Sequence, residues 1–419
     1  MLVFKFGGAS VKDAGGIINL ASVIKKYTGE QLLIVVSAMG KTTNALESLT
    51  RAYVDQSDNM HLIYEGIKQY HFDILHELFE PKHPVFDEIA NTFVEIDWMI
   101  EDEPHDEYDF IYDQIVSIGE LVSTRIISAY LNKEGLKNQW LDVRGYIHTD
   151  NTYREGVVQW DKTRESITRD IPALLDKGIV VTQGFLGGTS ENFTTTLGRE
   201  GSDYTASIFA ACLVAQSVTT WKDVPGILNA DPKFFTDTVK FDELSYSEAI
   251  EMTYYGASVI HPKTIKPLQN AHIPLLVKPF TDPSASGTII KEDGVNTFTK
   301  PVIILKQNQV LLSVSSKDYS FITEDHLSDI FGLFAQNQVK VNVMQTSALS
   351  FSVCFDFYEE RFEKLLHSLQ QDFKVKYNTG LTLITIRHHA EDGLKKLTEG
   401  KTVLLEQVSR NTAQMVVAS

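Results

Sequence analysis

Two short apolar runs near the N-terminus limit the possible folds more than any other feature of this sequence. Residues 1–8 read MLVFKFGG and residues 31–37 read QLLIVVS. Nearly continuous apolar runs of this length are typical of parallel strands that are covered on both faces. Since a crossover connection must join parallel strands, the stretch 11–27 between the runs is expected to be a helix.

The same alternation continues to about residue 290. Between residues 43 and 131, apolar side chains recur every three or four positions, which predicts helices. Further strands are expected at 139–143, 178–183, 217–221 and 273–279, and further helices at 203–215, 245–255 and 262–270. The pattern predicts an α/β domain over residues 1–290, with a mostly parallel sheet sandwiched by helices. A stretch rich in turn-forming residues, 281–300, is the expected linker to a second region.

The pattern changes after the linker. Residues 301–378 combine helix stripes with alternating strands in the order βαββαβ, which is an α+β unit. Residues 379–419 form an incomplete second unit, which a strand near 302–306 could complete by nesting one unit within the other. Its expected elements are a helix near 390–398 and strands at 402–408 and 412–417. The strand 412–417 is expected at an exposed edge, where subunits could pair.

Charge and cysteine content exclude several classes of protein. The chain has 419 residues, with 38 Lys and Arg against 55 Asp and Glu, and a formal net charge of −17. That balance argues against binding to nucleic acids or membrane surfaces, although local cations can still hold an anionic substrate. The two cysteines, Cys212 and Cys354, lie in apolar runs and are expected to be core thiols. With no signal-like N-terminus and no apolar run of membrane-spanning length, we expect a cytoplasmic protein.

The first strand ends in a glycine-bearing turn that could meet a phosphate. Gly7 and Gly8 would let the backbone approach a ligand, and Lys5 could reach over the turn toward phosphate oxygens. Ser10 lies in the same turn. An ordinary tight turn with a surface lysine would have the same sequence, so this signal alone leaves both interpretations open.

The second turn, residues 37–44, imitates a P-loop through its Gly-Lys-Thr sequence. A P-loop needs a glycine five positions before the glycine of that triplet, and Val35 stands there, inside the strand. We therefore reject a Walker A motif. The hydroxyls of Ser37 and Thr43 remain available to bind a small polar ligand or to cap the helix.

The third turn is long and combines glycines, threonines and an arginine. It contains Gly184 and Phe185 and continues through Arg199 to Ser202 and Asp203. The planar guanidinium of Arg199 suits a carboxylate or a phosphate, while Ser202 or Asp203 could simply cap the next helix. The concentration of small residues and hydroxyls around one arginine predicts a ligand site here.

Two further features could belong to a site. Glu120 lies in an almost wholly apolar helix with small neighbours, which would suit a ligand unless the residue lies on an exposed strip. The loop 221–233 carries acids, cations, glycine and prolines, which suit either a polyphosphate or ordinary turns. The histidines show no spacing of metal ligands, so no metal site made of protein side chains is expected.

Taken together, these stretches resemble the aspartokinases of the amino-acid kinase superfamily, and the tail resembles their paired ACT regulatory modules. The matching segments occur in family order, at 5–10, 37–44, 117–120, 184–185, 194–206, 221–233 and 255–262. The resemblance implies ATP-dependent phosphorylation of the side-chain carboxylate of L-aspartate to 4-phospho-L-aspartate, with Mg²⁺. This is the first step toward lysine, threonine and methionine.

The resemblance also assigns roles to residues. It implies that Lys5 contacts the transferred phosphate, with Asp203 and Arg199 as its partners in catalysis. Aspartate would be held by Ser37, Thr43, Glu120, Phe185, Arg199 and Ser202, with Glu120 on its ammonium and Arg199 on a carboxylate. The phosphate loop would contain Gly7, Gly8 and Ser10, and the nucleotide would lie along Lys222, Asp223, Leu228, Lys233 and Ser258.

Some positions depart from the family pattern. Glu200 often corresponds to glycine, and Ser258 stands where a lysine usually contacts the nucleotide. Lys222 or Lys263 is a candidate to replace that lysine. Because Lys5 is expected at a strand end near solvent, Lys5→Ala is expected to lower kcat greatly with little change in stability.

The resemblance further implies feedback regulation and a homo-oligomer that forms through the ACT modules. Lysine or threonine is the expected effector, and Met344, Gln345, Thr346 and Ser347 are candidates to bind it or to be ordinary strand residues. Two alternatives stay open. One is another kinase of the superfamily, acting on glutamate, acetylglutamate or a nucleotide, and the other is a catalytically weak amino-acid sensor.

Overall fold

A computed structural model describes residues 1–257, 260–294, 298, 300–318, 320–389 and 397–418. The chain divides into two compact units that do not follow chain order. The first unit takes residues 1–227 and 240–250 and the described part of 259–296, and the second takes 228–239 and 251–257 and the described residues from 298 onward. The segments 228–239 and 251–257, which the sequence analysis assigns to the N-terminal domain, thus belong to the second unit.

The first unit is built on an eight-stranded sheet with the order β3-β4-β2-β1-β7-β9-β10-β8. Every neighbouring pair is parallel except β9 and β10. The prediction of a mostly parallel α/β sheet is therefore confirmed. The strands are β1 Leu2–Phe6, β2 Leu32–Val36, β3 Asn138–Leu141, β4 Ile179–Gln183, β7 Ser217–Lys222, β8 Glu243–Ser245, β9 Leu275–Pro279 and β10 Thr288–Lys291.

Side chains of the central strand alternate between two layers of helices. On one face, Phe6 stacks with Trp221 and Phe4 meets Trp221 edge-on, and the ring of Phe4 lies 4.7 Å from that of Tyr27, just after the first helix. Lys5 points to the other face, toward Asp203. The helices up to residue 270 are α1 Ala14–Lys25, α2 Thr42–Val54, α3 Met60–Leu78, α4 Val85–Ile100, α5 Tyr108–Lys133, α6 Trp160–Leu175, α7 Gly201–Leu213, α8 Tyr246–Tyr254 and α9 Pro262–Asn270.

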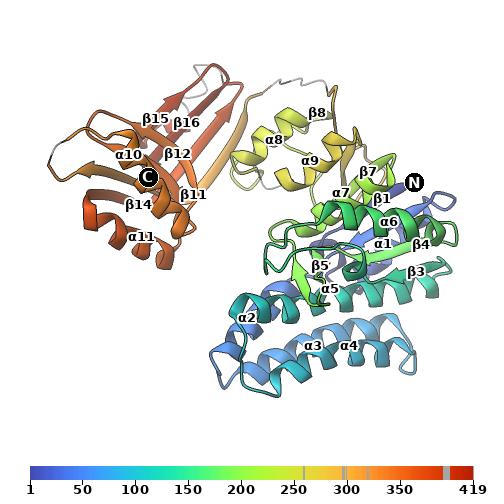
Figure 1. Ribbon diagram of the computed structural model, residues 1–419. Coiled ribbons are helices and arrows are strands. Elements are labelled where there is room, and N and C mark those ends of the chain that lie inside the picture. The colour runs from blue at the N-terminus through green and yellow to red at the C-terminus, as the bar shows by residue number, and fades with distance from the viewer. Residues whose placement is uncertain (258–259, 295–297, 299, 319, 390–396, 419) are drawn as a thin grey trace. The chain divides into compact units, whose positions relative to one another are not determined.

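Helix α5 packs against α1 and against β2, β3 and β4, whereas α7 packs on β1, β2 and β7 and is flanked by α6 and α9. Figure 1 shows α3 and α4 beyond α5, on the side away from the sheet. Within the described part of the chain, no helix is both long enough and apolar enough to cross a membrane.

One part of the expected linker is a strand of this sheet. β10 pairs antiparallel with β9 and parallel with β8, and its Ile290 is fully buried. The chain reverses before β10 at Gly287, whose φ is +70° and where a Cβ would lie 2.2 Å from the carbonyl oxygen of Val277. The prediction of a linker over 281–300 is therefore wrong for β10, because a four-residue strand between turn formers has too short a pattern to be recognised.

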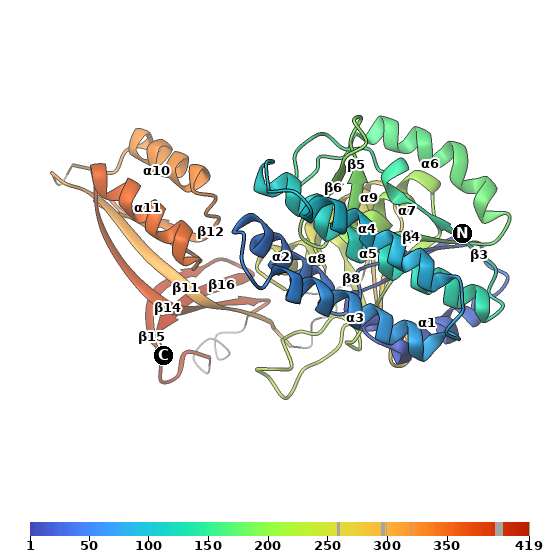
Figure 2. The same ribbon diagram turned by 90° about the horizontal axis from the view of Figure 1, so that it is seen from below.

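The second unit contains a six-stranded sheet in the order β12-β13-β11-β14-β16-β15, antiparallel throughout. Two helices pack on one face of it, which Figure 2 shows, and their apolar stripes form a core with β11 and β13. The elements are β11 Val302–Ser316, α10 Glu324–Gln336, β12 Val341–Thr346, β13 Phe351–Asp356, α11 Glu359–Asp372, β14 Phe373–Arg387, β15 Thr402–Val408 and β16 Thr412–Ala418.

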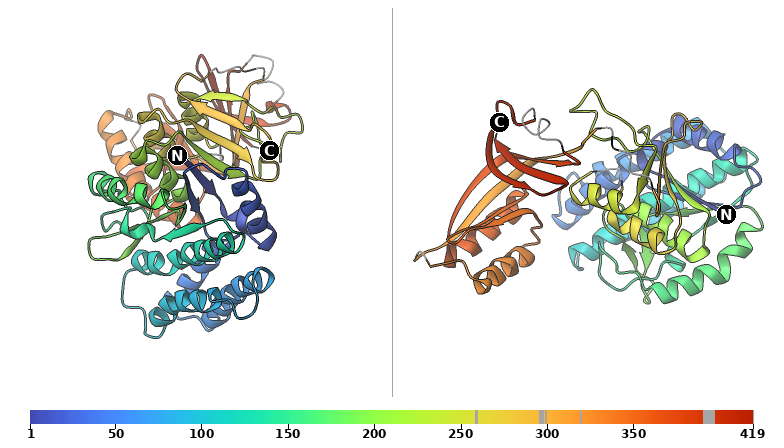
Figure 3. Two further views of the ribbon diagram at one scale, coloured as in Figure 1. Left: turned by 90° about the vertical axis from the view of Figure 1, so that its right-hand side faces the viewer. Right: turned by 90° about the horizontal axis from the view of Figure 1, so that it is seen from above.

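Two 15-residue strands, β11 and β14, run through this sheet (Figure 3, right). The start of β11, residues 302–306, pairs with residues 383–387 of β14, and its later part pairs with both β13 and β14. β16 lies between β14 and β15, so the expectation that 412–417 forms an exposed edge is wrong. The position of a strand in a sheet depends on which strands it pairs with, and the hydrophobic pattern of its own sequence does not reveal these partners. The expected helix near 390–398 falls mostly outside the described residues.

The C-terminal end of α7 carries a residue that is unfavourable for its backbone conformation. Val214 has φ +51° and is 77% exposed, and the backbone N–H groups of Val214 and Ala215 both donate to the carbonyl of Ala210. Glycine is the usual residue at such a helix end, since a Cβ is strained in the left-handed region.

We therefore expect Val214→Gly to raise the free energy of unfolding by about 1 kcal/mol. Urea unfolding followed by circular dichroism measures this change. Val214→Ala, which keeps a Cβ but removes the branch, is the matched control and should give a smaller gain. Destabilisation by Val214→Gly would contradict the assigned backbone conformation.

Candidate active site

The loops after the central parallel strands touch one another at the carboxyl edge of the sheet, where α/β proteins usually bind ligands. A Cβ on Gly8 would lie 2.6 Å from the carbonyl oxygen of Ala38 and 2.9 Å from that of Gly40. The N–H of Gly40 also donates to the carbonyl of Gly8 at 3.0 Å. The turn after β1 thus rests directly on the turn after β2, and glycine is needed at position 8.

The third glycine-bearing turn joins the same edge. The N–H of Gly184 donates to the carbonyl of Val36 at 2.9 Å, and a Cβ on Gly184 would lie 2.4 Å from the Cβ of Ser202. Phe185 has φ +72°, and its N–H donates to the hydroxyl of Thr205 at 3.0 Å. The end of β2, the end of β4 and the first turn of α7 are therefore held together.

A buried ion pair joins the central strand to α7. The ammonium of Lys5 lies 2.8 Å from Oδ2 of Asp203, and the hydroxyl of Thr220 on β7 donates to Oδ1 at 3.2 Å. Burial opposes ionisation of Asp203, but the charges of Lys5 and Lys222 hold its pKa below the usual range. A Cβ on Gly7 would lie 3.5 Å from the Lys5 ammonium, so this cation sits beside the first turn.

Glu200 adds a second carboxyl group to this cluster. It precedes α7 with φ +55° and ψ +27°, a conformation that is uncommon for a residue other than glycine. Burial and the neighbouring charge and hydrogen bond of Asp203 raise its pKa, while Lys222 and Lys5 act in the opposite direction. The two carboxyl groups and the two lysines therefore form one electrostatic cluster.

Glu120 on α5 is a buried carboxyl group, and one of its two oxygens lacks a hydrogen-bond partner among the described residues. It is 2% exposed, and Oε1 accepts a hydrogen bond from the N–H of Ala38 at 3.3 Å. Among the residues that the structure describes, Oε2 is buried and has no partner. Burial raises the pKa of Glu120 to about 8. Ala38 links this carboxyl group to the turn that Gly8 contacts.

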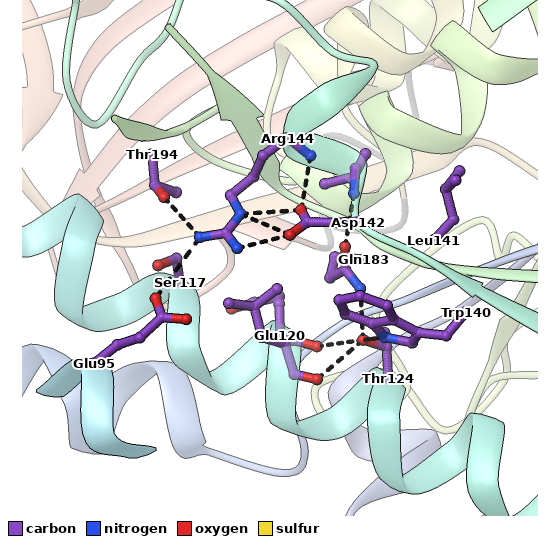
Figure 4. A network of polar contacts seen from close by, with 12 residues as sticks. Glu95, Ser117, Glu120, Thr124, Trp140, Leu141, Asp142, Arg144, Gln183 and Thr194 are labelled. Carbon is purple, nitrogen blue, oxygen red and sulfur yellow. Dashed lines mark hydrogen bonds and ion pairs between the residues drawn. The ribbon is translucent and has the colours of Figure 1, made fainter. Parts of the chain in front are cut away.

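A polar network fixes the part of α5 that carries Glu120 (Figure 4). The hydroxyl of Thr124 accepts hydrogen bonds from Trp140 at 2.9 Å and from Gln183 at 2.8 Å, and donates to the backbone carbonyl of Glu120. Gln183 in turn accepts from the N–H of Val143 at 2.8 Å. Because these partners lie on β3, β4 and the turn after β3, they tie the helix to the sheet.

Comparisons with known proteins show the family. The amino acid kinase family model matches residues 1–279. Lysine-sensitive aspartokinase 3 of Escherichia coli is 30% identical over 393 residues, which cover 92% of this chain and 86% of that protein. The chain belongs to the aspartokinases.

The structural comparison agrees with this membership. The crystal structure of E. coli aspartokinase III in complex with aspartate and ADP, an R-state structure, matches with a TM-score of 0.87 at 28% identity. The match covers 100% of this chain and 96% of that one. A bifunctional aspartokinase/homoserine dehydrogenase 2 of Arabidopsis thaliana is 30% identical over 389 residues, but the chain spans only 42% of its length.

Several residues that the aspartokinase resemblance singles out lie at the same edge. The carbonyl of Ser37 accepts a hydrogen bond from Ser123 on α5 at 2.8 Å, and Thr43 lies in the first turn of α2. Ser10 donates to the carbonyl of Trp221 at 3.4 Å, next to Lys222 at the end of β7. The structure therefore brings together the predicted phosphate loop, Lys222, Asp203 and the predicted aspartate-site residues on α5, on α7 and in the turn after β4.

Other predicted residues are placed differently. Arg199 is exposed and has no hydrogen bond or ion pair with any described residue, and Asp223 is exposed after β7. Leu228 and Lys233 belong to the second unit, and Ser258 lies outside the described residues. Of the two candidates for the missing nucleotide lysine, Lys222 lies within range of Asp203 and Glu200, whereas Lys263 lines a cavity between α6, α7 and α9.

The candidate effector residues lie at the end of β12, an edge strand of the second sheet. Met344 is 51% exposed, and Gln345, Thr346 and Ser347 are exposed as well. Their side chains are therefore not core positions of that sheet.

The sequence analysis missed a buried acid that positions the site. Asp113 is fully buried on α5 and accepts hydrogen bonds from the N–H of Arg154 at 2.8 Å and from Thr196 through its N–H and hydroxyl at 2.9 and 2.7 Å. Thr196 ends the small hairpin of β5 Leu186–Gly188 and β6 Thr194–Thr196, three residues before Arg199. The signal was present, because Asp113 is an acid in the same apolar helix as Glu120.

We expect Asp113→Ala to lower the free energy of unfolding by about 3 kcal/mol or more, because each buried donor left without a partner costs about 1–3 kcal/mol. Urea unfolding measures this loss. Asp109→Ala is the matched control on the same helix, because Asp109 is exposed and its ion pair within the described chain is with Arg154 at 3.3 Å. It should cost less than about 1 kcal/mol. Equal effects of the two changes would refute the role given to Asp113.

Proposed function

We propose that this aspartokinase transfers the terminal phosphoryl group of ATP to the side-chain carboxylate of L-aspartate, giving 4-phospho-L-aspartate and ADP. The observation that carries the proposal is the incomplete carboxylate of Glu120, which the N–H of Ala38 joins to the turn beside Lys5. One edge of the sheet thus offers an anion for an ammonium group and a cation for a phosphate. An amino acid and a nucleotide together match that pair of charges.

The reaction needs no general base, because the attacking carboxylate is already an anion. The main obstacle is the repulsion between this anion and the phosphates, so positive charge and positioning supply most of the catalysis. Lys5 is the group for this task, since its ammonium lies beside Gly7 at the first turn. Asp203 holds that ammonium in place in the free protein, and Thr220 donates a hydrogen bond to the other oxygen of Asp203.

Substrate recognition follows from the charges at the edge. Glu120 binds the ammonium of aspartate, and Arg199, which has no partner among the described residues, takes a carboxylate. Ser37, Thr43, Phe185 and Ser202 line the same pocket in this proposal. A zwitterion with a second carboxylate satisfies both Glu120 and Arg199, which a sugar or a nucleotide would not do.

The nucleotide binds along the turn containing Gly7, Gly8 and Ser10 and along Lys222 and Asp223 after β7. Assignments to Leu228, Lys233 and Ser258 rest on the resemblance alone. Mg²⁺ usually takes one or two protein carboxylates together with phosphate oxygens and water, and it would neutralise phosphate charge here. Glu200 and Asp203 would supply such carboxylates, while no group of three or more possible metal ligands occurs in the described parts of the chain.

Regulation by an amino acid is proposed through the second unit. The E. coli relative is named a lysine-sensitive enzyme. The exposed end of β12, Met344 to Ser347, offers backbone and side-chain groups at a sheet edge, where a second copy of the chain can pair. We propose lysine as the effector and a homo-oligomer that forms through this edge, in the cytoplasm, where both free cysteines stay reduced.

A coupled assay of ADP release tests the whole proposal. We expect turnover with L-aspartate and ATP·Mg²⁺, no turnover with L-glutamate or N-acetylglutamate, and inhibition by lysine but not by threonine. Turnover only with another acceptor would replace aspartate as the substrate. Lysine binding without any turnover would instead support an amino-acid sensor.

Lys5 is more buried than the sequence suggests, since it is 6% exposed and paired with Asp203. The expectation that Lys5 lies near solvent is therefore wrong, and the reason for expecting an almost unchanged stability of Lys5→Ala no longer holds. Lys5→Ala leaves a buried charge unpaired and should cost about 3–5 kcal/mol of stability, besides lowering kcat by about 10²–10³-fold.

Lys5→Met combined with Asp203→Asn removes both charges and separates the two effects. This double variant should regain much of the melting temperature of the wild type, yet stay inactive. Near-full turnover in either variant would remove Lys5 from the mechanism.

Aspartate affinity should depend on pH through Glu120. Because burial raises its pKa to about 8, the free protein must lose a proton before the carboxylate can pair with an ammonium. The KM for aspartate should therefore fall as the pH rises toward 8 and then level off. Steady-state kinetics across about pH 6 to 8.5 measure this trend.

Glu120→Gln is the control, with a raised KM that no longer varies with pH in this way.

A second readout of the Glu120 pKa uses the stability of the free protein. Its Glu120 binds a proton on folding between the ordinary pKa of 4.5 and the raised value, so stability falls as the pH rises through that range. Glu120→Gln should remove this loss. An unchanged KM for the variant would show that Glu120 does not bind the substrate.

A further inference from the structure

A cavity of about 690 Å³ lies on the outer side of the helix layer formed by α6, α7 and α9 in the first unit. Its size falls within the usual range of small-molecule sites. Its lining includes neither Lys5, Glu120 nor Arg199, and none of its lining residues lies in the turns after β1, β2 and β4. The cavity is therefore separate from the proposed catalytic site.

The cavity is a groove with α7 as its floor and α6 and α9 as its walls. α7 contacts both neighbouring helices, and it contributes Tyr204 and Ala211, two turns apart on one face. Trp160 and Arg164 lie one turn apart on α6. The wall from α9 includes Lys263 and Lys266, which are again one turn apart.

Three cations line this groove without a carboxylate. Arg164, Lys263 and Lys266 form no side-chain hydrogen bond or ion pair with any residue in the described ranges, and the lining contains no Asp or Glu. Burial raises the pKa of Cys212 on α7 to about 11 and the charge of Arg164 acts against it, so Arg164 lies close to the floor. In a chain of net charge −17, such a cluster creates a local field that attracts anions.

One end of the groove is aromatic. The rings of Trp160 and Tyr204 lie 6.4 Å apart with planes at 68°. Burial raises the pKa of Tyr204, so its hydroxyl stays neutral and can donate a hydrogen bond. Aromatic surface beside unpaired cations suits a ligand with a flat ring and a dianionic group.

We propose that this groove binds a small aromatic phosphate, with the phosphate between Arg164 and the two lysines and the ring against Trp160 and Tyr204. Because Tyr204 directly follows Asp203 in α7, the ligand contacts the helical turn that carries the buried ion pair with Lys5.

The test measures binding of 1-naphthyl phosphate to the full-length protein by titration calorimetry, with saturating ADP and aspartate present to fill the catalytic site. We expect saturable binding that weakens with added salt and is tighter than that of inorganic phosphate. Arg164→Ala and Lys266→Ala should each weaken it by about tenfold or more. Lys162→Ala is the matched control, because Lys162 is an exposed cation on α6 that does not line the groove. It should bind the probe as the wild type does.

Four results would overturn the proposal. Absence of binding would remove the site, and displacement of the probe by ADP would make the groove part of the nucleotide site. An equal loss in Lys162→Ala would show that only general surface charge attracts the probe. Equal affinity for inorganic phosphate would remove the aromatic part of the ligand. Because binding is measured without turnover, failure here is distinguishable from failure of the proposed kinase activity.

Discussion

The buried ion pair between Lys5 and Asp203 holds the catalytic unit in one arrangement. Lys5 lies in the central strand, between β2 and β7, and Asp203 lies in the first turn of α7. A buried charge is tolerated only when it is paired, so strand and helix can be packed in only one relative position. The glycines at 8 and 184 then allow neighbouring turns to close around that position without a side chain between them.

Glu120 and Lys5 show how one sheet edge can provide groups for two ligand charges of opposite sign. Both side chains are buried beneath turns. One oxygen of Glu120 has no partner among the described residues until a ligand binds, and the ammonium of Lys5 depends on the neighbouring charge of Asp203. The hydrogen bonds around Thr124 and Asp113 hold α5 and the small hairpin in the free protein, and the ion pair with Asp203 holds Lys5. Such preorganisation reduces the rearrangement needed when substrates bind.

Much of this arrangement could be predicted from the sequence, and the exceptions have physical causes. Continuous apolar runs identified the parallel strands, and ordered motifs identified the segments that carry Lys5, Glu120 and Asp203. Local patterns could not show that β10 returns to the sheet or that β16 is an interior strand, because both depend on distant pairing partners. The burial of Lys5 was missed for a similar reason, since its partner lies 198 residues away in the chain. In the sequence, Glu200 stands out only as a departure from the family pattern, and only the structure shows that it lies beside Asp203.

The two long strands of the second unit determine how the proposed regulatory signal would pass through its sheet. β11 and β14 both run through the parts of the sheet that the sequence presents as two modules, but their pairing shifts register between Lys306 and Gln309 and again between Gln309 and Leu311. Within the described residues, β12 pairs with β13, and β13 pairs with residues 309–314 of β11. An effector bound at β12, as proposed, would therefore act first on this part of the sheet, and the irregular pairing around Gln309 is where that part would bend against the rest.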